Sequence, residues 1–364
     1  MADSKQSIRI QSVTIEGFRS LQSIQQLELP QLAVLIGANG AGKSTLIRFF
    51  EMLSRMLKSQ NLQEFVLRQG GGDDQFFMGA RQTPCIHAEI SLQTTAGLNS
   101  YRFDLTHISA GDTVMVSNEA YRGTNWVELK EVGKEARLPE QTDATAKAIC
   151  SVLRNCATYQ FHDTSPKAAI RLRWDTSESF RLRSDGGNLA AVLLDLYESD
   201  LPRYKIIVRQ IQRVLPTFKD FVLEPLAGKV ELRWQGLYSD KVFGAHLTSD
   251  GSLRLFCLLT LLNLPPERLP DVMFFDEPEL GLHPHAITLV AEMLKRLSSK
   301  HQVFVATQSP YMVDCFALEN IIVAESQRGE TRLRNLPRED YQEWLDDDYQ
   351  LSDIWLKNPV GGGA

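Results

Sequence analysis

A glycine-rich segment that ends in a lysine and a serine, "IGANGAGKST" at residues 36–45, has the spacing G-x-x-x-x-G-K-[ST]. In this pattern the glycines let main-chain N–H groups wrap a phosphate, the lysine reaches the outer phosphates, and the hydroxyl supplies an oxygen to Mg²⁺. The spacing therefore predicts a pocket for a nucleoside triphosphate. Its predicted residues are Gly37, Ala38, Asn39, Gly40, Ala41, Gly42, Lys43, Ser44 and Thr45.

A pair of carboxylates follows a short apolar run in "DVMFFDEPELGLHP", which begins at Asp271. Nucleotide hydrolysis needs a carboxylate that holds Mg²⁺ and a group that polarises the attacking water. We expect Asp276 to bind the metal together with Ser44, and Glu277 to act on the water. The alternative is an acidic pair on the surface after a strand.

Two further polar segments are candidates for contact with a triphosphate. In "QVFVATQSP", Gln308 follows an apolar run and is expected to sense the γ-phosphate, although a simple turn is the alternative. In "HLTSDGSLR", Ser249 and Gly251 precede an apolar helix, whose N-terminus favours anions. Because the chain already has a phosphate loop, this second site is predicted to complete the pocket of another chain. Taken alone, Ser249 or Asp250 would only cap the helix.

Buried strands and one amphipathic helix are predicted to position these motifs. Residues 32–36, 272–275 and 303–306 are continuous apolar runs, which are typical of parallel strands covered on both faces. After Lys43, apolar residues recur at helical spacing. They are Leu46, Phe49, Phe50, Leu53 and Leu57. The phosphate loop is therefore predicted to join a strand to a helix N-terminus, where the helix dipole also favours an anion.

The rest of the chain shows two kinds of pattern. Residues 60–140 alternate short strand-like runs, such as "CIHAEISLQ" and "SYRFDLTH", with polar turns, which predicts an antiparallel sheet. Residues 143–220 are predicted to be mainly helical, with "NLAAVLLDLYESDLPRYKIIVRQIQRVLPTF" as the clearest case.

The composition is that of an ordinary globular protein. The 364 residues are 43% hydrophobic and 23% charged, with a formal net charge of −6, which disfavours a mostly basic nucleic-acid coat. The start "MADSKQSIRI" lacks the apolar core of a signal peptide, and the run "LRLFCLLTLLNL" is too short to cross a bilayer. The five cysteines have no C-x-x-C spacing and are expected to be free thiols. Together these features predict a cytoplasmic protein.

Taken in order, the motifs resemble those of the ABC-type ATPases, specifically the RecF/SMC/OLD-like branch. "IRIQSVTIEGFRSLQSIQQLEL" is similar to the branch's first strand and F-R-S turn, and "TSDGSLR" to its signature loop. "FFDEPELGLHP" resembles its Walker B motif and D-loop, and "ATQSP" its switch strand. "FHDTSP", "LRSDGGNLAAVLLDL" and "LSDIWLKNPVGGG" resemble stand-alone bacterial AAA-family ATPases of this branch that have no nuclease domain.

The resemblance implies an α/β fold of the P-loop NTPase class and the ABC-ATPase head type, with a mixed central sheet, an antiparallel β-subdomain and an inserted helical lobe. The implied organisation has four parts. They are an N-terminal ATPase lobe (1–142), a mainly helical insertion (143–220), a C-terminal ATPase lobe (221–340) and a tail (341–364).

The resemblance also implies that two chains enclose two ATP molecules with Mg²⁺. Each site would combine the phosphate loop of one chain with Ser249 and Gly251 of the other. Residues 280–283 would form the D-loop between the sites, and Arg19 would lie near the nucleotide. The implied partners are a second copy of the chain, DNA, and a separately encoded effector such as a nuclease, but no membrane.

This sequence departs from the family pattern at three places. The signature position that is usually glycine is Asp250, after Thr248 in place of leucine. A carboxylate there would weaken ATP-driven dimerisation unless it points away. The switch residue, often histidine, is Gln308, which cannot gain a charge, so slow turnover is expected. The lid glutamine has three candidates, which are Gln75, Gln82 and Gln93.

A cluster of arginines among aromatic residues lies in "AIRLRWDTSESFRLRSDGG". Such arginines could contact DNA phosphates and stack on bases, or they could form structural ion pairs on a hairpin. The arginines are Arg171, Arg173, Arg181 and Arg183, around Trp174 and Phe180. His283 and His285 form an H-x-H pair that is expected to be structural, and Asp346, Asp347 and Asp348 are expected to be a solvated surface.

An ATP-hydrolysing switch that acts on DNA or on an effector is the first hypothesis for function, in the setting of repair or anti-phage defence that the resemblance implies. The ATP-binding subunit of a membrane transporter is the second, and an ATP-binding module with vestigial hydrolysis is the third. A GTP switch is disfavoured because no N-K-x-D motif is present. Residues 311–364 are too few for a nuclease domain, so if nuclease chemistry is involved, another polypeptide is expected to carry it.

Overall fold

The computed structural model describes residues 8–59, 61–130, 133–341 and 349–357. The acidic run at 346–348 and the glycine-rich end lie outside the described residues. The chain divides into two compact units. Unit 1 comprises residues 1–157, 271–274 and 298–364, and unit 2 comprises residues 158–270 and 275–297.

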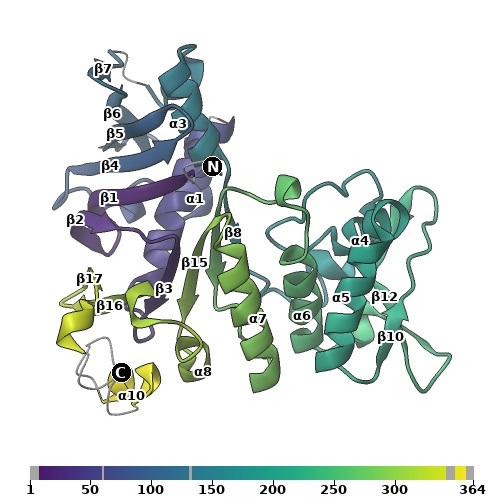
Figure 1. Ribbon diagram of the computed structural model, residues 1–364. Helices are drawn as coiled ribbons and strands as arrows, with labels where there is room; N and C mark the ends of the chain where they lie inside the picture. The colour runs from purple at the N-terminus through teal and green to yellow at the C-terminus, as the bar shows by residue number, and fades with distance from the viewer. Residues whose placement is uncertain (1–7, 60, 131–132, 342–348, 358–364) are drawn as a thin grey trace, which may run out of the picture. The chain divides into compact units, whose positions relative to one another are not determined.

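An antiparallel sheet forms one part of unit 1. Its strand order is β2-β1-β4-β5-β6-β7, as labelled in Figure 1, and side chains along β4 alternate between buried and partly exposed. The strands are β1 (Arg9–Phe18), β2 (Leu21–Glu28), β4 (Cys85–Thr94), β5 (Gly97–Ile108), β6 (Thr113–Arg122) and β7 (Trp126–Glu128). This confirms the antiparallel sheet that the alternating pattern predicted, and β1 and β2 extend it at one edge.

A mixed sheet carries the phosphate loop. Its order is β17-β16-β3-β15-β14-β8, in which β3 pairs in parallel with β15 and β16, and β17 runs antiparallel to β16. The strands are β3 (Leu32–Ile36), β8 (Cys156–Tyr159), β14 (Val272–Asp276), β15 (Gln302–Thr307), β16 (Ile321–Gln327) and β17 (Glu330–Asn335). Every residue of β3, β14 and β15 is buried, as the continuous apolar runs predicted. Strands β8 and β14 begin in unit 1 and continue into unit 2.

The described part of unit 1 also contains helices. They are α1 (Lys43–Ser59), α2 (Leu62–Arg68), α3 (Ala144–Arg154), α8 (Pro310–Val313) and α10 (Leu351–Leu356). Helix α1 packs against α3, and its apolar face lies in the core. Within that face, the ring of Phe50 stacks on Phe274 and Phe304 of the mixed sheet. The loop that precedes α1 is therefore anchored by a helix that is fixed in the core.

Unit 2 is built from four helices and two small sheets. The helices are α4 (Leu189–Ser199), α5 (Leu201–Val214), α6 (Asp250–Leu261) and α7 (Pro284–Leu297). One sheet pairs β10 (Phe218–Phe221), β12 (Arg233–Gly236) and β13 (Val242–Gly244), and the other pairs β9 (Trp174–Asp175) with β11 (Lys229–Val230). Phe256 of α6 packs against Phe218, Phe221 and Trp234 of the first sheet, so the helix of the signature turn is held by an aromatic cluster.

The segment around the arginine cluster differs from the expected hairpin. Strand β9 does not pair with a neighbouring strand in the sequence but with β11, more than fifty residues away. The side chain of Asn188 donates to the carbonyls of Glu178 and Arg181 and accepts from the amide of Arg183, which folds the intervening residues into turns. Residues 160–188 therefore contain no α-helix, although the region 143–220 also includes α3, α4 and α5.

Candidate functional site

The phosphate loop connects β3 to α1 with a backbone that only glycine accepts at its ends. Gly42 has φ +95°, and a Cβ there would lie 1.9 Å from Oγ1 of Thr331. A Cβ on Gly37 would lie 2.3 Å from the carbonyl oxygen of Ala324. Gly40, in contrast, has φ +77° with open space around it. The loop is thus packed against β16 and β17 at both ends while its crest is open, which is the shape that a phosphate cradle needs.

Lys43 is the first residue of α1 and is only 5% exposed. Its Nζ donates to the carbonyls of Gly37, at 2.6 Å, and Ala38, at 3.0 Å. The ammonium is therefore held over the loop by the loop's own backbone. The first turn of α1 contains no acidic residue, so nothing on that turn offsets the positive end of the helix dipole. Ser44, one residue on, is exposed.

Three hydroxyl side chains join the end of the loop to distant strands. Ser20 donates to Oγ1 of Thr45 at 3.1 Å, and Thr331 donates to Oγ of Ser20 at 2.8 Å. The amide of Thr331 also donates to the carbonyl of Ser20 at 2.7 Å. This hydroxyl network, formed by Ser20, Thr45 and Thr331, fixes the F-R-S turn beside the phosphate loop. Sequence patterns did not identify Thr331, because it lies far along the chain from both partners.

Arg19 lies in the same turn with φ +50°, a conformation that is rare outside glycine. Its Nε and Nη2 donate to Oε1 of Gln75, at 3.2 and 3.0 Å, and Nη2 also donates to Oε1 of Gln69. Burial, and then the charge of Arg48, lower the pKa of Arg19. A guanidinium held in this way beside the loop has a fixed orientation.

The three candidates for the lid glutamine occupy different environments. Gln75 is fully buried and bonded to Arg19, whereas Gln82 is exposed in a turn. Gln93 lies on β4, and its Nε2 donates to the carbonyl of Thr94 at 3.4 Å. Among the three, Gln75 has contact with the F-R-S turn.

Asp276 ends β14 in unit 2 and is 8% exposed. Its Oδ2 accepts from Nε2 of Gln160 at 2.7 Å, and its carbonyl is 2.9 Å from Nε2 of His162. Gln160 therefore orients the carboxylate, while His162 contacts the main chain of the same residue, and sequence patterns identified neither partner. Glu277, the next residue, has φ +45°. A left-handed conformation at a glutamate is strained, and such strain is common at functional positions.

The signature turn lies against the D-loop within unit 2. Ser249 caps α6 by accepting from the amide of Ser252 at 3.3 Å, and its own side chain is exposed. A Cβ on Gly251 would lie 2.4 Å from the carbonyl oxygen of Gly281, so this position requires glycine for the close approach of two backbones. Asp250 is not the capping residue.

One arginine of α6 holds the signature turn to the surrounding chain. Arg254 donates through Nε to the carbonyl of Phe161, through Nη2 to that of His162, and through Nη1 to that of Leu280. The three distances are 3.1, 3.1 and 3.2 Å. Helix α6 is therefore tied both to the segment after β8 and to the D-loop.

Gln308 follows β15 in unit 1 and is partly buried. Thr307 before it is fully buried and accepts from the amide of Ser309 at 3.0 Å, and Ser309 caps α8. The turn after the switch strand is thus ordered by its hydroxyl side chains.

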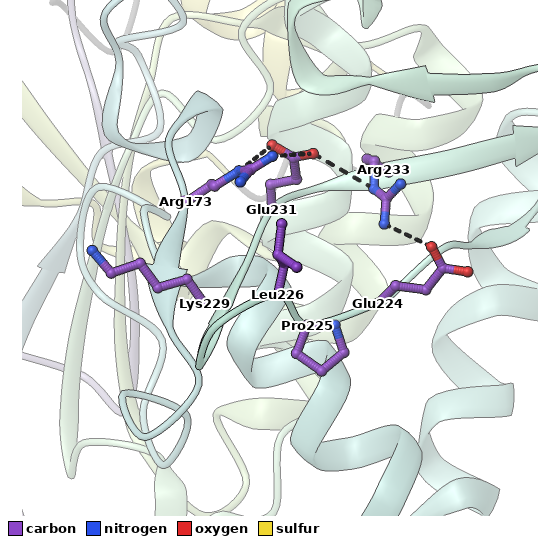
Figure 2. Close-up of a pocket in the computed structure, with 7 residues that line it drawn as sticks. All are labelled: Arg173, Glu224, Pro225, Leu226, Lys229, Glu231 and Arg233. Carbon is purple, nitrogen blue, oxygen red and sulfur yellow. Dashed lines mark hydrogen bonds and ion pairs between the residues drawn. The ribbon is translucent and has the colours of Figure 1, made fainter.

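Arginines of the cluster form ion pairs with carboxylates. Arg171 pairs with Asp250, and Arg183 lies 3.6 Å from Glu178. Arg173 donates to both oxygens of Glu231, at 3.0 and 3.4 Å. Figure 2 shows Glu231 between Arg173 and Arg233 in a cavity that is also lined by Glu224, Pro225, Leu226 and Lys229. These pairs favour the structural interpretation of the cluster over a DNA contact.

No group of three or more His, Cys, Asp or Glu side chains suited to a metal ion occurs among the described residues. His283 accepts at Nδ1 from the amide of His285, at 3.4 Å. In the same described part of the chain, none of the helices is both long enough and apolar enough to span a bilayer.

Two family matches cover successive parts of the chain. Residues 9–168 match the family described as "AAA ATPase domain", and residues 161–314 match "AAA domain, putative AbiEii toxin, Type IV TA system". The first match contains the phosphate loop, and the second contains the signature turn, Asp276, Glu277 and Gln308. No curated protein sequence matches the chain.

Two solved structures have a similar fold. One is the SMC head bound to the C-terminal winged-helix domain of ScpA, with a TM-score of 0.59, 15% identity, and coverage of 92% of this chain and 99% of that one. The other is the SMC head with an extended coiled coil bound to the C-terminal domain of ScpA from Pyrococcus furiosus, with a TM-score of 0.58, 14% identity, and coverage of 94% and 99%. Successive parts of the chain thus match AAA-family ATPase domains, and its fold is similar to that of SMC heads, which confirms the predicted fold class and resemblance.

Proposed function

We propose that this protein is an ATP-binding and ATP-hydrolysing switch. The observation that carries the proposal is the phosphate loop, whose ends are packed against neighbouring strands, whose crest is open, and over which Lys43 is held by two carbonyls. Main-chain amides, a helix N-terminus and one fixed ammonium form the donor set that a triphosphate requires. The AAA-family matches support the same substrate.

The roles of the individual residues follow from their chemistry. Lys43 and the loop amides would bind the phosphates, and Ser44 and Asp276 would hold Mg²⁺. Asp276 fits this role because it is a carboxylate already oriented by Gln160. Bound Mg²⁺ would neutralise charge on the phosphates, while Glu277 would orient the attacking water. Gln308 would contact the γ-phosphate.

The signature turn is proposed to act on a second copy of the chain. The Ser249 hydroxyl is exposed at the N-terminus of α6. Because the phosphate loop of the same chain already binds its nucleotide, the signature turn is available to contact the nucleotide of another chain. In a symmetric dimer, each nucleotide would lie between the loop of one chain and the turn of the other. ATP would close this dimer and hydrolysis would open it.

The output of the switch is proposed to be a protein effector in a reducing compartment rather than DNA alone. The ion pairs of Arg171, Arg173 and Arg183 disfavour a DNA contact at the arginine cluster. The free thiols of the five cysteines suit such a compartment. We propose that the switch acts in repair or in anti-phage defence. The alternative hypothesis is that ATP hydrolysis is vestigial, because Gln308 cannot gain a charge.

ATP turnover and molecular mass, measured together on the purified chain and on Glu277→Gln, test the proposal. The wild type should hydrolyse ATP, and the variant should lose about 100-fold or more of the rate and accumulate as an ATP-bound dimer. Duplex DNA added to parallel samples separates a DNA-stimulated switch from one that waits for a protein. Unchanged ATP turnover in Glu277→Gln would show that Glu277 does not orient the attacking water. A wild-type protein that binds ATP without hydrolysing it would favour the hypothesis of vestigial hydrolysis.

A further inference from the structure

Arg171 holds three separate segments of unit 2 together. It ends a short 3₁₀ helix (Ala169–Arg171), and only 10% of its side chain is exposed. Its Nε donates to the carbonyl of Thr164 at 2.9 Å, and its Nη1 donates to the carbonyl of Ala245, just before the signature turn. Its Nη2 donates to Oδ1 of Asp250 at 3.0 Å. The guanidinium thus uses three of its donors in three directions.

Asp250 is the residue whose charge needs this partner. It is the first residue of α6, directly between Ser249 and Gly251, and its side chain is 59% exposed. A carboxylate at this position stabilises the helix through its dipole but cancels the positive potential with which the same helix end would meet a phosphate. An unpaired Asp250 would therefore repel the anion that the signature turn is proposed to bind.

We propose that Arg171 is the positioning residue of the signature turn, which neutralises Asp250 and directs its carboxylate away from the anion bound by Ser249. This assignment rests on the proposed function and deepens it. The hydrogen bonds to Thr164 and Ala245 keep the guanidinium in place, so its charge remains fixed beside Asp250. Arg254 holds the opposite side of the turn to the D-loop, but it contacts only carbonyls and leaves the charge of Asp250 unchanged.

A set of four variants separates this electrostatic role from a purely structural one. They are Arg171→Met, Asp250→Asn, the double variant, and Arg203→Met. Arg203 is a matched control, since it also bonds a carboxylate, of Asp200, and a carbonyl, of Asn263, but at α5. Two quantities are measured for each variant with a nonhydrolysable ATP analogue. One is nucleotide affinity at low protein concentration, and the other is the dimer dissociation constant by sedimentation.

Arg171→Met should weaken the analogue-bound dimer by about tenfold or more. The Asp250 carboxylate would then be unpaired and would repel the phosphates of the nucleotide bound by the other chain. Its nucleotide affinity as a monomer should stay within about twofold of wild type, since the phosphate loop is unchanged. Adding Asp250→Asn should restore most of the lost dimer affinity, and Asp250→Asn alone and Arg203→Met should dimerise like the wild type. If Arg171→Met fails to fold, Arg171→Lys keeps the charge and should dimerise within a few-fold of wild type.

Failure of the inference differs from failure of the proposed function. A wild-type chain that stays monomeric with saturating analogue would overturn the dimer itself and this assignment with it. A wild type that dimerises, together with an Arg171→Met that either dimerises equally well or is not rescued by Asp250→Asn, would overturn only the role of Arg171. A folded Arg171→Lys that dimerises no better than Arg171→Met would also overturn it.

Discussion

The phosphate loop and the signature turn are two helix N-termini that we propose bind phosphate, and they are built in opposite ways. At the loop, contiguous residues supply the site, and glycines allow the backbone to follow it. At the signature turn, hydrogen bonds to distant segments hold the helix, above all those of Arg171 and of Arg254, which is on the helix itself. The phosphate-binding groups of the first site come from one contiguous segment, while the second site is assembled from segments that meet only after unit 2 has folded.

This difference predicts different consequences of mutation. Removing a side chain of the loop should abolish nucleotide binding without unfolding the chain, because the side chains of the loop make few contacts that hold other elements in place. A side chain removed around the signature turn should loosen unit 2 and leave nucleotide binding at the loop intact.

Of these changes, Lys43→Ala should have the largest effect, and that effect should be on ATP binding. Loss of the only ammonium at the loop should lower ATP affinity by about a thousandfold, about 4 kcal/mol. The thermal unfolding midpoint without nucleotide should change little. Calorimetric titration and a melting curve measure both quantities, and a parallel loss of both would contradict the contrast.

Gly42→Ala should be the most destabilising change within the loop. The new Cβ would meet Oγ1 of Thr331, on a buried side chain, and would require a left-handed backbone, at a combined cost of about 3 kcal/mol. Gly40→Ala is the matched control, since its φ is also positive but the space around it is open, and about 1 kcal/mol is expected. Denaturant unfolding compares the two, and equal effects would refute the packing argument.

Arg254→Met should destabilise the protein by about 2 kcal/mol, because three carbonyls lose a charged donor. Nucleotide affinity of the monomer should remain within about twofold of wild type. Hydrogen exchange should show faster opening of α6 and the D-loop than of α1. If α1 opens equally, the two regions do not behave as separate structures.

Thr331→Val keeps the shape of the side chain and removes its hydroxyl. The network with Ser20 then loses one hydrogen bond, which should cost about 1 kcal/mol of stability. ATP affinity should fall only slightly, since the main-chain bond from residue 331 to Ser20 persists. A loss of affinity as large as that of Lys43→Ala would mean that the network contacts the nucleotide itself.

His87 and Asp104 form a pair on the antiparallel sheet. This pair should make folding stability depend slightly on pH without affecting the phosphate loop or the signature turn. Their hydrogen bond raises the pKa of His87 and lowers that of Asp104. The pair therefore stabilises the fold fully at pH values between the ordinary pKa of an aspartate and that of a histidine. This stabilisation is lost as the pH rises through the raised pKa of His87, and also as the pH falls through the lowered pKa of Asp104. His87→Asn should remove the dependence near neutral pH, and a change in ATP affinity alongside it would be unexpected.

Sequence patterns predicted the features that are contiguous. The phosphate loop, the buried strands and the antiparallel sheet each depend on neighbouring residues, and their expected positions agree with the structure. The pairs that were missed join distant residues, such as Gln160 with Asp276, Ser20 with Thr331, and Arg171 with Asp250. The expected hairpin around Trp174 was wrong for the same reason, because β9 finds its partner in β11. The domain boundaries at 142, 220 and 340 remain predictions.

The central claim is that the loop of one chain and the signature turn of another enclose one triphosphate, and mixing two inactive variants tests it most directly. Lys43→Ala and Ser249→Arg should each be inactive alone, because every site of either dimer lacks one half. An equal mixture should recover about a quarter of wild-type ATP turnover, since half of randomly formed dimers have one intact site of two. A mixture that stays inactive while both variants bind each other, or a Ser249→Arg variant that is fully active alone, would contradict the account.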